Sequence, residues 1–160
     1  MVYETFEEVV NSRPELAALR GTGLERSEAL RRDLEWLRVE NGVDPTPPCG
    51  QVGLEYRALL LRLAEESLPR FLCHFYNHYF AHTAGGRAIG KRMADALLEG
   101  RTLAFYQWEG DVKELLEGAR RSIDRLAEDW TAEERQACLE ETAASFQYGT
   151  ALVGYMKPSE

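Results

Sequence analysis

The three histidines of this 160-residue chain, His74, His78 and His82, lie close together in the sequence. Their i, i+4, i+8 spacing places them along one face of a single helix. Two histidines at i and i+4 can bind Zn²⁺, but a closed zinc site needs further ligands. The sequence has no HExxH pattern and no histidine elsewhere. We therefore favour His74 and His78 as core residues with hydrogen-bond partners, with a metal site as the alternative.

Three glycines, Gly85, Gly86 and Gly90, continue the same helical pattern. A helix face without Cβ atoms is flat, so a planar ligand could approach its backbone. Close packing against another helix is the alternative interpretation of these glycines. His82 precedes Gly85 by three residues and Gly86 by four, so it shares their face. A polar side chain at that position could hold a water molecule or a ligand near its reactive centre.

The elements that must position these residues are predicted to be helices. The chain has 21 Leu, 21 Glu, 18 Ala and 16 Arg, but only 2 Ile and 8 Val. The abundant types lose little rotamer freedom in a helix, whereas β-branched residues lose more. A length of 160 residues suits one domain. We therefore predict a single all-α domain over residues 1–160.

Apolar periodicity and helix-end signals divide the chain into segments. We expect Ser12 to be an N-cap, Asn41-Gly42 to end a helix, the segment Asp44–Gly50 to form the main loop, and Thr131 with Glu134 to form a capping box. The predicted helices are residues 2–10, 24–40, 53–66, 69–99, 111–129 and 131–155, and a short aromatic segment covers residues 102–108.

Charge and composition argue against several classes of protein. The 19 basic and 27 acidic residues give a net charge of −8, and no basic block is present, which is a poor basis for binding nucleic acid. No apolar run is long enough to span a membrane, and Met1-Val2-Tyr3-Glu4 lacks the basic start of a signal peptide. Cys49, Cys73 and Cys138 have no CxxC spacing, which indicates free thiols in a reducing compartment.

The histidine and glycine segment, CHFYNHYFAHTAGGR at residues 73–87, resembles the distal-helix signature of plant and algal haem oxygenases. Other motifs that match the family follow in the correct order, and together they cover Met1 to about Tyr155. They are TGLER at 22–26, DLEW at 33–36, FYQWEG at 105–110, WT at 130–131, CLEET at 138–142 and SF at 145–146.

This resemblance implies an all-α fold in which haem lies between a proximal and a distal helix. It implies cleavage of haem to biliverdin, CO and iron, with O₂ and with electrons from reduced ferredoxin. The product would feed phytochrome or phycobilin chromophores, in the plastid or cytoplasm of a photosynthetic cell. No nucleic acid and no membrane are expected among the partners.

The resemblance also implies roles for particular residues of the distal helix. Gly85 and Gly86 would lie against the plane of the haem, with Gly90 further along the same face. His82 would match the polar distal residue that orders water beside bound O₂, which is a role in proton delivery.

Outside the distal face, the resemblance places Arg120 towards a haem propionate, where a charge-assisted hydrogen bond would form. Phe146 would be an apolar wall of the pocket. Arg87, Lys91 and Arg92 form a basic cluster that could face an acidic ferredoxin. A solvated helix face is the alternative for that cluster.

The proximal haem ligand of the family is a histidine upstream of the region that matches Met1-Val2-Tyr3, and this chain has none before His74. Three interpretations follow: a truncated haem oxygenase, a non-catalytic relative that binds a tetrapyrrole or a partner protein, or a helical bundle with a His-rich metal site. Loss of one helix would expose an apolar patch, so we also expect self-association.

Overall fold

The structure is a computed structural model that describes residues 1–42 and 50–154. Within these ranges it contains no β-strand, which confirms the all-α prediction. The loop predicted at Asp44–Gly50 falls almost entirely outside the described residues. The elements are α1 (Val2–Ser12), η1 (Pro14–Leu19), α2 (Ser27–Asn41), α3 (Gln51–Glu66), α4 (Leu68–Ala81), η2 (His82–Gly86), α5 (Arg87–Leu97), η3 (Ala104–Tyr106), α6 (Val112–Leu126), α7 (Ala132–Glu140) and α8 (Thr142–Val153).

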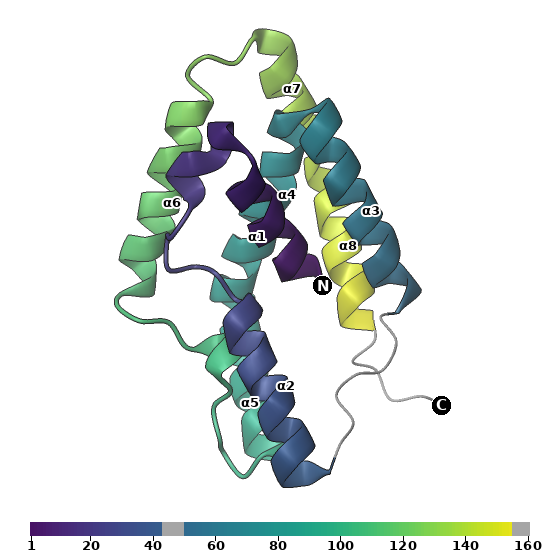
Figure 1. The fold of residues 1–160 in the computed structure, drawn as a ribbon, viewed down its shortest axis with the longest axis vertical. Coiled ribbons are helices and arrows are strands. Elements are labelled where there is room, and N and C mark those ends of the chain that lie inside the picture. The colour runs from purple at the N-terminus through teal and green to yellow at the C-terminus, as the bar shows by residue number, and fades with distance from the viewer. Residues whose placement is uncertain (43–49, 155–160) are drawn as a thin grey trace.

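Helix α4 is at the centre of the bundle and packs against α3, α6, α7 and α8 (Figure 1). Helix α1 lies across α4 and packs on α3. Phe6 of α1 is fully buried, and its ring meets the rings of Tyr56, Phe71 and Phe75 from α3 and α4. Burial of each such side chain contributes roughly 1.5–3 kcal/mol, so these rings hold α1, α3 and α4 together.

Helix α2 begins at Ser27, three residues later than predicted. The carboxylate of Glu7 on α1 accepts hydrogen bonds from the backbone N–H groups of Arg26 and Ser27, at 2.7 and 3.0 Å. A carboxylate from another helix therefore satisfies donors at the start of α2. The predicted end of this helix is confirmed, because Gly42 adopts the left-handed conformation with φ +61°.

Ser12 is not the N-cap that the sequence predicts. It is the last residue of α1, and its hydroxyl donates a hydrogen bond back to the carbonyl of Val9 at 3.1 Å. Arg13 precedes η1, which Pro14 starts. The hydroxyl of Ser12 had a competing backbone acceptor within its own helix, and the sequence does not show which partner it takes.

The helix predicted over residues 69–99 is three consecutive elements. Helix α4 begins at Leu68, His82–Gly86 is π-helical, and α5 continues to Leu97. In a π-helical turn, each backbone carbonyl accepts a hydrogen bond from the N–H group five residues further along the chain, and such turns are frequent at functional sites. The histidine and glycine segment singled out above is therefore the irregular part of this helix. A kink at the glycines stays a prediction.

The prediction of one continuous helix over residues 131–155 is wrong, because two helices, α7 and α8, occupy this segment. The capping box of Thr131 and Glu134 is confirmed, with hydrogen bonds of 2.8 and 3.2 Å, but α7 ends at Glu140 and α8 begins at Thr142. Glu141 occupies the junction and directs its carboxylate to the buried His74 of α4. This tertiary contact accompanies the break, which periodicity alone does not reveal.

Gly90 supplies a test of the packing, because a Cβ built on it would lie 2.5 Å from the ring of Tyr106. We expect Gly90→Ala to lower the free energy of unfolding by about 1–3 kcal/mol through overpacking. Gly118→Ala on α6 is the matched control, since its Cβ meets nothing closer than 4.0 Å; helix propensity should stabilise it by about 0.5–1 kcal/mol. Urea unfolding measures both, and an equal gain in both variants would contradict this packing.

Candidate functional site

A cavity of about 540 Å³ opens between the π-helical turn η2 and helix α8. Its volume is within the range of small-molecule sites. Residues of α1, α4, η2, α5, η3 and α8 line it, and most of the lining is apolar. His82, Gly85, Gly86 and Phe146, four of the residues predicted to form the site, all line this cavity.

His82 is fixed on two sides by residues from other elements. The hydroxyl of Tyr3 on α1 lies 2.8 Å from His82 Nδ1. The Phe105 ring stacks on the imidazole, with a centroid distance of 4.1 Å and an interplanar angle of 17°. Asp33 holds Phe105 in place, because its buried carboxylate accepts from the backbone N–H groups of Ala104 and Phe105 at 2.8 and 2.7 Å. The imidazole therefore has one orientation.

The other ring nitrogen of His82, Nε2, is buried and has no hydrogen-bond partner. Burial lowers the pKa of His82 to about 3, so the ring is neutral near pH 7 and carries one proton. Burial also raises the pKa of Tyr3, so the phenol keeps its O–H. If this O–H donates to Nδ1, only the Nε2–H group is left unsatisfied; the opposite tautomer leaves two groups unsatisfied. The tautomer with fewer unsatisfied groups therefore carries its proton on Nε2, and this N–H group has no acceptor among the described residues.

The glycines have three different environments. A Cβ at Gly85 would meet no atom within 4 Å, so this stretch of backbone is bare at the cavity. A Cβ at Gly86 would lie 2.7 Å from His82 Cδ2, so Gly86 makes room for the imidazole. Gly90 is buried under the Tyr106 ring and does not line the cavity. The flat-face interpretation therefore describes Gly85, and the close-packing interpretation describes Gly90.

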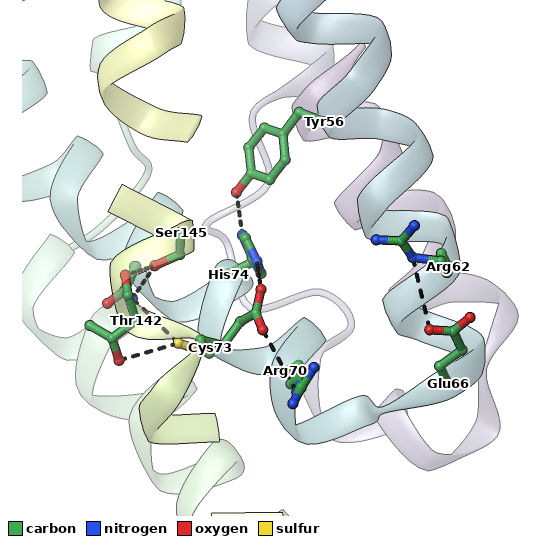
Figure 2. Close-up of polar contacts among 10 residues, drawn as sticks. Tyr56, Arg62, Glu66, Arg70, Cys73, His74, Thr142 and Ser145 are labelled. Carbon is green, nitrogen blue, oxygen red and sulfur yellow. Dashed lines mark hydrogen bonds and ion pairs between the residues drawn. The ribbon is translucent and has the colours of Figure 1, made fainter. Parts of the chain in front are cut away.

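His74 is a core histidine with both ring nitrogens engaged, as predicted. Its Nδ1 lies 3.0 Å from the Tyr56 hydroxyl, and its Nε2 lies 3.0 Å from Glu141 Oε1 (Figure 2). His78 packs among the rings of Tyr3, Phe6 and Tyr56. The described part of the chain has no group of three or more His, Cys, Asp or Glu suited to a metal ion.

The basic residues predicted to join the site lie outside the cavity. Arg120 is exposed on α6, with its guanidinium 2.7 Å from Glu117 and 3.4 Å from the hydroxyl of Tyr76 on α4. Neither Arg120 nor Tyr76 lines the cavity, and Arg120 instead lines a second hollow together with Phe80, Thr83 and Lys113. The basic residues of α5, exposed on the surface, are Arg87, Lys91 and Arg92.

Burial of His78 and His82 predicts that acid destabilises the protein before its carboxylates titrate. Burial lowers the pKa of His78 to about 4 and that of His82 to about 3, against 6.5 in the unfolded chain. Below pH 6.5 the two histidines therefore bind protons in the unfolded chain but stay unprotonated in the folded state. The free energy of unfolding then falls by about 1.4 kcal/mol for each histidine per unit decrease in pH. Above pH 6.5 this loss is absent.

Urea unfolding at pH 7.5, 6.0 and 5.0 measures this dependence. The variant His78→Gln should show a shallower decline between pH 6.5 and 5.0 than the unsubstituted protein, while keeping the contribution of His82. Equal slopes in the two proteins would show that His78 is not desolvated as described.

Several residues of the site do not emerge from the sequence as site residues. Tyr3 lies 79 positions from His82 and carries no spacing signal. Phe105 and Tyr106 belong to the aromatic segment at residues 102–108, whose composition marks it without indicating a role. Asn77 and Ser145 line the cavity from α4 and α8, and Asn77 Nδ2 donates to Ser145 Oγ at 2.6 Å.

Comparison with known proteins gives consistent matches. The family model described as Heme oxygenase matches residues 1–154. The chain is 44% identical over 158 residues to "Heme oxygenase 1, chloroplastic" of Oryza sativa subsp. japonica, covering 98% of this chain and 54% of the relative. It is 43% identical over 155 residues to "Heme oxygenase 1, chloroplastic" of Arabidopsis thaliana, covering 96% and 54%.

"Probable inactive heme oxygenase 2, chloroplastic" of Arabidopsis thaliana is also 43% identical over 155 residues, covering 96% of this chain and 51% of the relative. The chain thus spans about half the length of the curated relatives it matches. None of the helices in the described ranges is long and apolar enough to cross a membrane. Family match, helical fold and distal-helix motif agree: this chain belongs to the heme oxygenase family.

Proposed function

We propose that the cavity at η2 binds haem as a substrate, and that this chain takes part in cleaving it to biliverdin, CO and iron, with O₂ and with electrons from reduced ferredoxin. The observation that carries the proposal is the buried, unpartnered Nε2 of His82 beside the bare backbone of Gly85. A buried donor without a partner is costly. A ligand or ordered water in the cavity would satisfy it.

The lining fits a large planar apolar ligand. Gly85 offers no side chain to hinder approach, and Phe146 on α8 offers an aromatic wall that is 53% exposed. The apolar lining would exclude water from the ring of the substrate, and His82 Nε2–H would be a fixed donor beside it. Bound haem supplies the site that activates O₂; His82 would hold a water molecule in hydrogen-bond reach and pass a proton through it. Tyr3 and Phe105 would keep the imidazole neutral and aimed at the cavity.

Two further roles are proposed for basic residues. Arg120, held beside Tyr76 at the edge of α4, would bind a haem propionate by a charge-assisted hydrogen bond. Arg87, Lys91 and Arg92 would contact an acidic ferredoxin, supported by their exposure on α5. The chloroplastic names of the relatives support a plastid location.

Binding of a tetrapyrrole without cleavage is the second candidate function. It is supported by the 43% identity to a probable inactive heme oxygenase 2. The cavity would then serve recognition alone. Under either function we treat residues 1–160 as one domain, and exposed Ile89, Phe146 and Val153 near the cavity mouth favour self-association of the haem-free chain.

Titration with ferric haem tests the shared part of both functions. We expect saturable binding of one haem per chain, seen as a shift of its strongest absorption band. One arm of the titration includes free imidazole, which can supply an axial ligand to the haem iron. It is needed because the three histidines of residues 1–160 all lie on α4 and η2, and none faces His82 across the cavity. Absence of saturable binding in both arms would overturn the proposal.

Reduction of the haem complex in the presence of O₂ then separates the two functions. Reduced ferredoxin is the primary electron donor and ascorbate the chemical substitute. Biliverdin identified by its absorption and mass supports cleavage. Bound haem that yields no biliverdin with either donor would support tetrapyrrole binding and overturn the enzymatic proposal for this chain.

A further inference from the structure

We propose that Tyr56 is a redox-active tyrosine, which loses an electron to a one-electron oxidant while its phenol proton moves to His74. The proposal goes beyond the haem site, because it concerns a separate buried cluster and needs no bound haem. The cluster consists of Tyr56 on α3, His74 on α4 and Glu141 at the α7–α8 junction. Neither Tyr56 nor His74 lines the cavity.

Two hydrogen bonds join the three side chains of this cluster. The Tyr56 hydroxyl lies 3.0 Å from His74 Nδ1, and His74 Nε2 lies 3.0 Å from Glu141 Oε1 (Figure 2). Tyr56 and His74 are both fully buried. Burial raises the pKa of Tyr56 and lowers the pKa of His74, although Glu141 opposes the second shift. Near pH 7 the Tyr56 O–H therefore donates to Nδ1, and the Nε2–H of His74 donates to Glu141.

This arrangement gives the phenol the proton acceptor that its oxidation requires. A phenol that loses an electron becomes a much stronger acid, so its proton must leave with the electron. Tyr56 gives one electron to the oxidant, and its Oη proton crosses to His74 Nδ1. The products are a neutral tyrosyl radical, an imidazolium and an oxidant reduced by one electron. The new positive charge lies on His74 beside the Glu141 carboxylate, which stabilises it through a charge-assisted hydrogen bond.

The other tyrosine–histidine pair described above, Tyr3 with His82, lacks such a carboxylate. The Tyr3 hydroxyl lies 2.8 Å from His82 Nδ1, but His82 Nε2 has no partner within the described ranges. An imidazolium at His82 would be a buried charge without a counter-charge, which is costly. The positive charge of Arg26 opposes it further. A radical is therefore better stabilised at Tyr56 than at Tyr3.

Aromatic rings connect Tyr56 to the surface and to the cavity. The half-buried ring of Tyr148 on α8 stacks on Tyr56, with a centroid distance of 4.6 Å and an interplanar angle of 13°. The His78 ring lies 6.0 Å from Tyr56 and 4.7 Å from Tyr3, and His78 and Tyr3 both line the cavity. Electron tunnelling slows steeply with distance, so rings this close favour transfer between them. An oxidant outside the protein or in the cavity can therefore draw its electron from Tyr56.

Site-specific incorporation of 3-fluorotyrosine shows where the radical rests, because its fluorine nucleus adds a splitting to the electron paramagnetic resonance spectrum. The full chain, labelled in place of Tyr56, is mixed with ruthenium tris(bipyridine) and persulfate, illuminated and frozen. The photo-oxidised ruthenium complex is a one-electron oxidant too large to enter the core, so it reacts with exposed rings first. We expect fluorine splitting in most of the trapped radical for the label at Tyr56, and in little of it for the label at Tyr148.

Glu141→Gln tests the counter-charge. Its amide oxygen can still accept from the Nε2–H of His74, but it carries no charge to stabilise an imidazolium. We expect severalfold less Tyr56 radical in this variant than in the unsubstituted protein. Glu140→Gln is the matched control, because it removes the same charge from an exposed neighbour and should leave the yield unchanged. Circular dichroism and urea unfolding check the fold of both variants, and the label at Tyr56 decides the proposal even if Glu141→Gln does not fold.

Two results would overturn the proposal. The first is a trapped radical without fluorine splitting when Tyr56 carries the label, which is the result that a purely structural cluster gives. The second is an equal yield of Tyr56 radical in folded Glu141→Gln and Glu140→Gln. Neither readout depends on haem, so failure of this proposal is distinct from failure of the haem-binding proposal.

Discussion

Replacement of Gly85 by leucine is expected to weaken haem binding roughly 5- to 150-fold while making the folded protein more stable. A side chain at Gly85 meets no atom of the protein within 4 Å, so it enters the cavity without clashing with the fold. Glycine costs about 1 kcal/mol relative to alanine in a helix, and leucine recovers most of this. The same side chain occupies space that haem would fill; a clash of about 1–3 kcal/mol lowers affinity roughly 5- to 150-fold.

Urea unfolding and haem titration, measured on the same preparation, test whether Gly85→Leu raises stability while it lowers haem affinity. Ala96→Leu is the matched control, because Ala96 is exposed on α5 and does not line the cavity. It adds a leucine to α5, the helix that follows η2, and should leave haem affinity unchanged. Haem binding by Gly85→Leu as tight as by the control would show that the ligand does not approach Gly85.

Replacement of His82 by alanine is expected to slow biliverdin formation far more than it weakens haem binding. Loss of a positioned proton donor costs about 10²–10⁴-fold in rate. Loss of one hydrogen bond to a ligand or its water costs about 0.5–1.5 kcal/mol, or roughly 2- to 13-fold in affinity. His82→Ala also leaves the buried Tyr3 hydroxyl without its partner, so stability should fall by about 1–3 kcal/mol.

His82→Gln is the conservative variant to compare with His82→Ala. Its amide oxygen can accept a hydrogen bond from the Tyr3 hydroxyl, and its amide N–H group can still point into the cavity. We expect it to restore much of the rate and stability that alanine loses. Single-turnover measurement on the preformed haem complex separates rate from affinity. If His82→Ala abolishes binding altogether, or turns over as fast as the unsubstituted protein, the proton-delivery role is wrong.

Local sequence signals predicted the helical class and several features of the site. The capping box at Thr131 and the end of α2 at Gly42 were readable because caps depend on adjacent residues. The spacing of His82, Gly85 and Gly86 predicted one shared face, and the structure places all three at one cavity. Helical periodicity suffices for such groupings within a single element.

Contacts between distant elements were not predictable from the sequence. Glu7 caps α2 from another helix, and Asp33 holds Phe105 from 72 positions away. The break at Glu141 coincides with a contact to His74, 67 positions away in sequence. Each depends on which helices pack together, and residue types alone do not encode that.

The structure of the haem-bound protein, determined by crystallography, tests the central claim most directly. The proposal predicts electron density for haem in the cavity between η2 and α8, with its face over the backbone of Gly85 and His82 Nε2 directed at the ligand or at a water beside it. Haem density in the neighbouring hollow lined by Lys113 and Arg120, with the His82 cavity unchanged, would contradict the account.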